Sequence, residues 1–204
     1  PLDDPKTYEQ LRSGKTSRVL QLESGGMQKV LRELEPAGFQ DVSAVLALYR
    51  PGPMQFIPQY IEGKRTGKWK VPHPLLKDIL DETYGIIVYQ EQIQMVAQRL
   101  AGYSLGEADI LRRAVSKKKA EILAQERENF VNRAVAQGID EQVASEVYDM
   151  IVLFADYGFN RAHSAAYAVI SVMTAYLKAH FPVEFMAANL TVAIGDSKKL
   201  ASIL

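Results

Sequence analysis

The residues with the clearest chemical capacity are basic ones that lie close together. Within the eight residues from 112 to 119, five are basic and none is acidic: Arg112, Arg113, Lys117, Lys118 and Lys119. On a helix, Arg113 and Lys117 would stack one turn apart, and like charges at that spacing repel each other. Arginine offers a planar fork to phosphate oxygens, and lysine offers a point charge. The cluster therefore predicts a polyphosphate or phosphate-backbone site. The alternative is a solvated helix face that is paired with nearby acids, namely Glu107, Asp109 and Glu121.

A second basic run surrounds the single tryptophan of the chain. Lys64, Arg65, Lys68 and Lys70 flank Trp69 in a glycine-containing segment. Basic side chains interleaved with an aromatic ring can hold a single nucleic-acid strand by charge and stacking. The favoured interpretation is nevertheless a solvated loop in which Trp69 folds onto the core.

The usual catalytic signatures are missing from the sequence. It contains no cysteine, and its three histidines are too widely spaced for a zinc site. It has neither a G-x-S-x-G nucleophile turn nor a Walker A or G-x-G-x-x-G phosphate loop. The acids mostly alternate with bases at helical spacing, so no carboxylate cluster for two-metal phosphoryl transfer is evident. The sequence predicts a phosphate-binding surface without metal ligands, which is half of an active site.

The composition is that of a globular domain without a strong charge bias. The 204 residues include 24 basic and 24 acidic side chains, and 48% are hydrophobic. This length suits one large domain, and neutrality disfavours a protein that coats DNA. The first residues are unlike a secretory signal, and the most apolar stretch, residues 165–177, is too short to span a bilayer. Because the chain begins with proline, we expect a piece of a longer polypeptide; the alternative is removal of an initiator methionine.

Hydrophobic spacing predicts a mostly helical framework for these residues. Apolar positions three and four residues apart predict helices over residues 27–34, 42–49, 93–100, 104–119, 122–136, 142–155, 164–180 and 182–194. Ser104 and Glu107 are spaced as a capping box, and the stretch 164–180 is apolar nearly all round, which predicts burial on most sides. Prolines and glycines predict irregular structure over residues 55–74, and residues 84–89 predict a strand or a buried extended loop.

Ordered blocks of the sequence resemble a known family. In chain order they are residues 19–27 (VLQLESGGM), 49–53 (YRPGP), 84–92 (YGIIVYQEQ), 101–109 (AGYSLGEAD), 111–114 (LRRA), 117–119 (KKK), 157–167 (YGFNRAHSAAY) and 175–186 (AYLKAHFPVEFM). These blocks resemble the catalytic alpha subunits of bacterial DNA polymerase III, the C-family of replicative DNA polymerases. The likeness extends from the first residues to about residue 193.

The resemblance implies a fingers domain, the mostly helical part of the polymerase that closes over the incoming deoxynucleoside triphosphate (dNTP). The expected fold class is mainly α, a multi-helix domain with a small irregular or short-strand insert near residues 50–90. Residues 1–20 are expected to be a linker from the preceding palm domain, residues 21–195 the helical fingers domain, and residues 196–204 the start of the following segment. The metal-binding aspartates of the family belong to the palm. No catalytic or metal-binding residue is therefore expected in this chain, and the cofactor Mg²⁺ is expected on ligands outside it.

The resemblance also implies roles for individual residues. Arg112 and Arg113 are expected to hold the β- and γ-phosphate oxygens of the dNTP, with Lys117 as a second candidate on the same helix face. His163 is expected to contact the ribose or triphosphate and to crowd a 2′-hydroxyl; its alternative is a capping or core histidine. Asn160 is expected to bond its own backbone or the nucleotide. Arg161 keeps the basic charge that many relatives carry as lysine.

Further contacts are expected with DNA and within the protein. The side chains expected to contact DNA are Lys118, Lys119, Lys64 and Arg65, although solvent is the alternative for Lys118 and Lys119. Residues 86–88 are expected in the core, with Gln90 and Glu91 as polar contacts in the nucleotide pocket. Arg50 is expected to pair with an acid, and His180 is expected to be structural.

The resulting prediction is the fingers region of a bacterial replicative DNA-directed DNA polymerase. It would bind the incoming dNTP and the adjacent template-primer DNA for two-metal nucleotidyl transfer, and alone it is expected to be inactive. Its expected partners are the palm of the same polypeptide and, through regions outside this chain, other replicase subunits and the sliding clamp. A cytoplasmic location without membrane association is expected. The alternative is a helical nucleic-acid-binding module whose basic cluster follows the DNA backbone.

Overall fold

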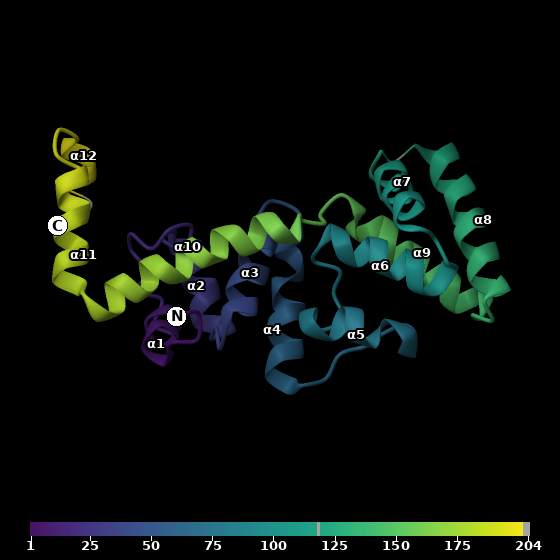
Figure 1. Cartoon of the computed structure of the whole chain (residues 1–204), viewed down its shortest axis with the longest axis horizontal. Coiled ribbons are helices and arrows are strands. Elements are labelled where there is room, and N and C mark those ends of the chain that lie inside the picture. The colour runs from purple at the N-terminus through teal and green to yellow at the C-terminus, as the bar shows by residue number, and fades with distance from the viewer. Residues whose placement is uncertain (118, 202–204) are drawn as a thin grey trace. The chain divides into compact units, whose positions relative to one another are not determined.

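The computed structural model describes residues 1–117 and 119–201, without the side chains of Lys198 and Lys199, and it is mainly α, as predicted (Figure 1). The helices are α1 (Pro5–Arg12), α2 (Gly25–Leu34), α3 (Phe39–Leu48), α4 (Ile57–Thr66), α5 (Lys77–Leu80), α6 (Gln90–Ala101), α7 (Leu105–Ser116), α8 (Ala120–Ala136), α9 (Glu141–Ala155), α10 (Arg161–His180), α11 (Pro182–Val192) and α12 (Ser197–Ala201). Short 3-10 helices are η1 (Pro53–Phe56), η2 (Pro74–Leu76) and η3 (Asp81–Thr83). Among the described residues, no helix is both long and apolar enough to cross a membrane.

The chain divides into two compact units. The first unit consists of Pro1–Leu46 and Ala165–Leu204, and the second of Ala47–Ser164. The stretch expected as a linker, residues 1–20, contains α1, and the domain boundaries expected at residues 20 and 195 stay predictions.

In the first unit, α10 supports the segment between α1 and α2. Ser171 Oγ donates to the carbonyl of Leu20 at 2.8 Å, and the N–H of Leu20 donates to Thr174 Oγ1 at 3.1 Å. His180 Nε2 lies 2.9 Å from the Asp4 carboxylate that caps α1, which fits a structural histidine. The side of α10 that carries Ala168 is fully buried.

The opposite side of α10 is exposed in the described structure. Ile170 is 47% exposed and Met173 is 56% exposed, although both are large and apolar. The expectation that residues 164–180 are buried on most sides is therefore wrong, because only one side of the helix packs on its own unit. A helix that is apolar on all sides can be buried on all of them. How much of it is buried depends on the helices that pack against it.

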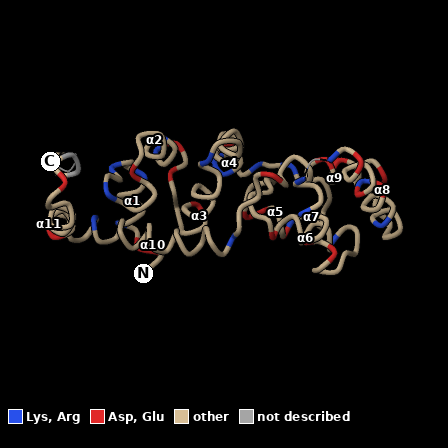
Figure 2. The backbone as a smooth tube through the Cα atoms, turned by 90° about the horizontal axis from the view of Figure 1, so that it is seen from above, with Lys and Arg blue, Asp and Glu red and all other residues tan. Residues whose placement is uncertain are grey.

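In the second unit, α6, α7, α8 and α9 pack together around one core (Figure 1). Their largest fully buried side chains include Ile93, Phe130 and Tyr148. Acidic and basic positions are interspersed along these helices (Figure 2). Oppositely charged side chains of neighbouring helices form ion pairs. One of them joins Arg133 Nη1 of α8 to Glu107 Oε1 of α7 at 3.1 Å.

The expected insert near residues 50–90 is more helical than predicted. Residues 57–66 form α4. Pro58 lies in its first turn, where a backbone N–H would have no acceptor within the helix, so proline is tolerated there. The expected irregularity over residues 55–74 is thus wrong for this part. Residues 84–89 form no strand. Tyr84 and Gly85 form a half-buried turn with positive φ, so the alternative, a buried extended loop, is correct only for residues 86–89. Ile86, Ile87 and Val88 are buried in the core, as expected.

Candidate functional site

The two arginines of the basic cluster lie on α7 and share one acid. Arg112 donates to Asp109 Oδ1 from Nε at 3.1 Å and from Nη2 at 2.8 Å. Arg113 Nη2 lies 2.7 Å from Asp109 Oδ2. The side chain of Arg112 is only 17% exposed, whereas that of Arg113 is 69% exposed. One carboxylate thus balances two guanidiniums, and the guanidinium of Arg113 is the accessible one.

The shared acid remains ionised at neutral pH. Hydrogen bonds from Arg112 lower the pKa of the Asp109 carboxyl; partial burial of the carboxyl opposes this shift, and the charges of Arg112 and Arg113 add to it. The alternative of a helix face paired with nearby acids is therefore confirmed for Asp109. It is wrong for Glu107, which binds Arg133 instead. Phosphate binding by the two arginines stays a prediction.

Lys117 and Lys119 of the cluster do not continue the helix. α7 ends at Ser116, Lys117 occupies its C-cap position, and the extended residue Lys119 precedes α8. The predicted helix through residue 119 is wrong, since three consecutive lysines supply no apolar side chain to hold a helix against the core. Lys117 and Lys119 are exposed at this junction. Lys118 lies outside the described residues.

A second group of predicted residues surrounds the start of α10. The N–H of Phe159 donates to Val88 O at 3.0 Å, in an isolated parallel bridge between Tyr89 and Phe159. Asn160 then caps α10, because its Oδ1 accepts a hydrogen bond from the N–H of His163 at 2.8 Å. The ring of His163 is exposed and meets the ring of Phe159 edge-on at 5.3 Å. The Asn160 side chain therefore bonds nearby backbone, as expected, and His163 is not a core histidine.

Two acids hold this helix start in place. Glu91 of α6 accepts a hydrogen bond from Asn160 Nδ2 at 3.2 Å, and its two oxygens lie 3.2 and 3.1 Å from the N–H of Arg161. The Arg161 guanidinium makes two bonds to Glu82, at 2.8 and 2.7 Å, and lies 5.4 Å from the centre of the Tyr89 ring. A carboxylate at a helix start also complements the helix dipole. Glu91, expected in the nucleotide pocket, thus bonds within the protein, and the sequence carried no signal for Glu82, which is 79 residues from Arg161.

Helix α6 connects the two groups. Gln94 follows Glu91 by one turn and donates from Nε2 to Asp109 Oδ1 at 3.1 Å. Residues three apart lie on the same face of a helix. The arginine–aspartate cluster of α7 and the start of α10 are therefore both attached to one face of α6, which lies beside α7 (Figure 1). Residues that are distant in the sequence are brought together here within a single unit.

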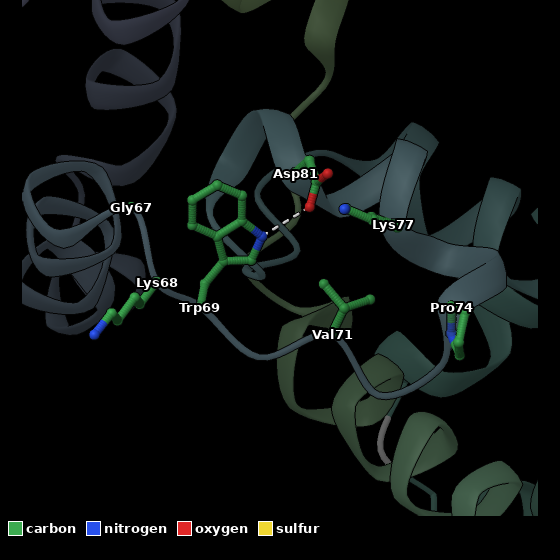
Figure 3. A pocket seen from close by; sticks show the side chains of 7 residues that line it. All are labelled: Gly67, Lys68, Trp69, Val71, Pro74, Lys77 and Asp81. Carbon is green, nitrogen blue, oxygen red and sulfur yellow. Dashed lines mark hydrogen bonds between the residues drawn. The ribbon is translucent and has the colours of Figure 1, made fainter.

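Trp69 of the second basic run is folded onto the protein, as favoured from the sequence. Its Nε1 donates to Asp81 Oδ1 at 2.8 Å, and its ring meets that of Tyr84 at 5.3 Å (Figure 3). An open pocket of about 680 Å³ adjoins it, lined by Gly67, Lys68, Trp69, Val71, Pro74, Lys77 and Asp81. Lys64 and Arg65 lie in the last turn of α4 rather than in a loop. Their contact with DNA stays a prediction.

Arg50 is structural, as expected, but its partners are not acids. Its Nη2 donates to the carbonyl of Tyr157 at 2.7 Å, and its Nε to the carbonyl of Ala47 at 2.9 Å. Its guanidinium also lies 4.5 Å from the centre of the Phe159 ring. The expected acid partner is therefore wrong. Arg50 instead supports the turn that leads into α10.

Comparison with known proteins agrees with the resemblance of the ordered sequence blocks. Residues 1–138 match the family described as the bacterial DNA polymerase III alpha subunit finger domain. The whole chain is 54% identical to DNA polymerase III subunit alpha of Halalkalibacterium halodurans over 205 residues, which are 18% of that protein. Proteins of the same name from Treponema pallidum and Thermus aquaticus are 54% and 53% identical, over 97% and 100% of this chain and 17% of each relative. The chain thus spans less than a fifth of the length of these relatives.

Proposed function

Because the chain belongs to the finger-domain family of the bacterial DNA polymerase III alpha subunit, we propose that it binds the triphosphate of the incoming dNTP within a longer replicative DNA polymerase. The observation that carries this proposal is the guanidinium of Arg113, which is 69% exposed and is held by Asp109. A guanidinium that is fixed at one nitrogen and accessible at the others suits the oxygens of a phosphate.

The chain would contribute positioning and charge to nucleotidyl transfer. Enzymes of this reaction mainly orient the phosphates and neutralise the charge that develops on them. Arg113 would bind phosphate oxygens, and the exposed Lys117 at the end of α7 would add a mobile positive charge. Asn160 and Arg161 anchor the start of α10, so the exposed ring of His163 has a fixed base from which to contact the sugar or the triphosphate.

The residues that the structure describes do not fit a magnesium site. Within residues 1–117 and 119–201, no three His, Asp or Glu side chains are grouped so that they could hold a metal ion. Asp109, the acid closest to the arginines, already accepts hydrogen bonds from Arg112 and Gln94. We propose, from the family resemblance, that the Mg²⁺ ligands lie in the palm of the longer polypeptide, and we assign this chain no step that passes through the metal.

Template-primer DNA is the second ligand of the proposed site. Lys119 is exposed at the junction of α7 and α8, and Lys64 and Arg65 end α4. Lys64 is half-buried, and Arg65 is exposed and paired with Glu62. Cations at helix ends can contact a phosphate backbone without reading its sequence. A helical module that only follows the DNA backbone is the competing function. In the full-length enzyme, the palm, the sliding clamp and other replicase subunits are the remaining proposed partners.

The deciding experiment replaces Arg113 in the full-length polymerase. Arg113→Ala is expected to lower kcat/KM for the dNTP by about ten- to a hundredfold, since a charge-assisted hydrogen bond is lost. The Kd for primer-template, measured by fluorescence anisotropy, should stay within about twofold of the wild-type value. The control is Lys29→Ala, which removes a 73% exposed cation from α2. A loss of DNA affinity with normal dNTP kinetics would favour the competing function.

A further inference from the structure

We propose that Asp109 is a positioning residue that fixes Arg113 for the triphosphate, and that Arg112 holds the Asp109 carboxylate in place. The inference rests on the proposed dNTP site. It adds a third residue, Asp109, to the two adjacent arginines of that site.

The two oxygens of Asp109 have different tasks. Oδ1 accepts three hydrogen bonds, two from Arg112 and one from Gln94, at 2.8–3.1 Å. These donors come from two helices, so they fix the carboxylate in position and orientation. Oδ2 faces Arg113, whose Nη2 lies 2.7 Å away. The carboxylate therefore acts as a rigid link between α6 and the guanidinium of Arg113.

Exposure separates the two arginines in the same way. The side chain of Arg112 is 17% exposed and lies against Asp109, whose side chain is 28% exposed. An arriving phosphate would meet Arg113, at 69% exposure, before it met Arg112. A guanidinium has five N–H donors, so Arg113 can keep its bond to Asp109 while other N–H groups bind phosphate oxygens. Orienting the guanidinium beforehand reduces the rotamer entropy that binding would otherwise cost.

If Asp109 had the opposite role, its removal would change nucleotide affinity in the opposite direction. If the carboxylate competed with the triphosphate for Arg113, its removal would strengthen nucleotide binding. If it positions Arg113, its removal leaves a mobile side chain and weakens binding. The three hydrogen bonds that Asp109 Oδ1 accepts favour the positioning role, because a phosphate would have to break them to displace the carboxylate.

The test measures steady-state dNTP kinetics of full-length Asp109→Asn, Asp109→Glu and Arg113→Ala polymerases. Asp109→Asn is expected to raise KM for the dNTP about tenfold with a smaller change in kcat, and Asp109→Glu to recover part of the loss. Primer-template Kd and the thermal unfolding midpoint of the enzyme are measured in parallel. Glu128→Gln, which changes an exposed acid on α8, is the charge-matched control and should leave KM unchanged.

Each outcome decides between the two claims. A normal or lowered KM in Asp109→Asn, together with a raised KM in Arg113→Ala, overturns the positioning role and leaves the dNTP site standing. A normal kcat/KM for the dNTP in Arg113→Ala overturns the dNTP site itself. Asp109→Asn and Asp109→Glu could instead lower the thermal unfolding midpoint and the activity to the same extent, with KM unchanged. Asp109 would then be a structural residue only, and the inference would fail.

Discussion

At the residue scale, side chains that look equivalent in the sequence have different surroundings in the fold. Arg112 and Arg113 are neighbours on α7, yet their exposed fractions are 17% and 69%. A helix turns by about 100° per residue, so adjacent side chains point to different sides. Arg113 is therefore accessible to a ligand, while Arg112 holds the Asp109 carboxylate. The side chain of Asn160 likewise bonds within the protein, because it accepts from the N–H of His163 and donates to Glu91.

The cap at the start of α10 can be tested by one substitution. Asn160→Ala removes the acceptor of the N–H of His163 and the donor to Glu91, so the free energy of unfolding of the chain should fall by about 1 kcal/mol. Chemical denaturation followed by circular dichroism measures this change. The control is Asn132→Ala at an exposed position within α8, which should be neutral or stabilising because alanine is the better helix former. Equal effects of the two substitutions would contradict the capping role.

Sequence reasoning located the basic and polar candidates of the site and one acid that holds them, Asp109, but it missed Glu82. Arg112, Arg113 and Asn160 were singled out by charge density and by resemblance. Asp109 was visible as a nearby acid, whereas Glu82 acts on a residue far away in the sequence. A pairing across so many residues depends on the packing of whole helices. No local pattern can reveal it.

At the element scale, the ends of the helices control the site more than their middles do. The predicted capping box of α7 is confirmed, since Ser104 Oγ accepts from the N–H of Glu107 at 3.3 Å and Glu107 Oε2 accepts from the N–H of Ser104 at 2.7 Å. Glu107 also binds Arg133 of α8. One acid therefore fixes both the start of α7, which carries the arginines, and its contact with α8.

The capping box should make stability depend on pH. Hydrogen bonds from Arg133 and from Ser104 lower the pKa of Glu107 from an ordinary 4.5 to about 2. A carboxyl whose pKa is lowered on folding stabilises the protein fully above the unfolded value and loses this contribution as the pH falls through the folded value. Glu107→Gln should therefore lower the unfolding midpoint at pH 7, and the difference from wild type should shrink between about pH 4.5 and 2. Thermal melts across this range test it, and a difference independent of pH would contradict the ionic role.

Two glycines inside helices provide a test and a control for how closely α4 packs against Tyr84. At Gly63 of α4, an added Cβ would lie 2.6 Å from the Cβ of Tyr84, whereas at Gly106 of α7 nothing lies within 4 Å. Gly63→Ala should lower the free energy of unfolding by about 1–2 kcal/mol, because the clash outweighs the better helix propensity of alanine. Gly106→Ala should leave it unchanged or raise it by up to about 1 kcal/mol. If Gly63→Ala also stabilises the chain, the close packing of α4 on Tyr84 is refuted.

Helices with a clear apolar period were predictable, and the exceptions have physical causes. The helices expected over residues 122–136 and 142–155 correspond to α8 and α9 within two residues. The helix α4 was missed because Pro58 was interpreted as a break, although a proline at the start of a helix is favourable. The helix expected through residue 119 ends early because charge repulsion and lack of packing outweigh local propensity.

At the scale of the whole molecule, the chain has no net charge, because 24 acidic side chains balance its 24 basic ones. Within the part that the structure describes, no acidic cluster could hold a metal ion. The 204-residue chain, incubated with primer-template, dNTPs and Mg²⁺, is therefore expected to show no primer extension on a denaturing gel, while the full-length polymerase extends the primer under the same conditions. Metal-dependent synthesis by the purified chain would contradict the placement of the catalytic ligands outside it.

The central claim is that Arg113, held by Asp109, binds the triphosphate of the incoming nucleotide. The most direct measurement is a structure of the full-length polymerase with primer-template DNA and a non-hydrolysable dNTP. The account predicts a guanidinium nitrogen of Arg113 within about 3.2 Å of a phosphate oxygen of the nucleotide, with the bond to Asp109 retained. An Arg113 side chain that contacts the DNA backbone or only solvent, while the nucleotide is bound elsewhere, would contradict it.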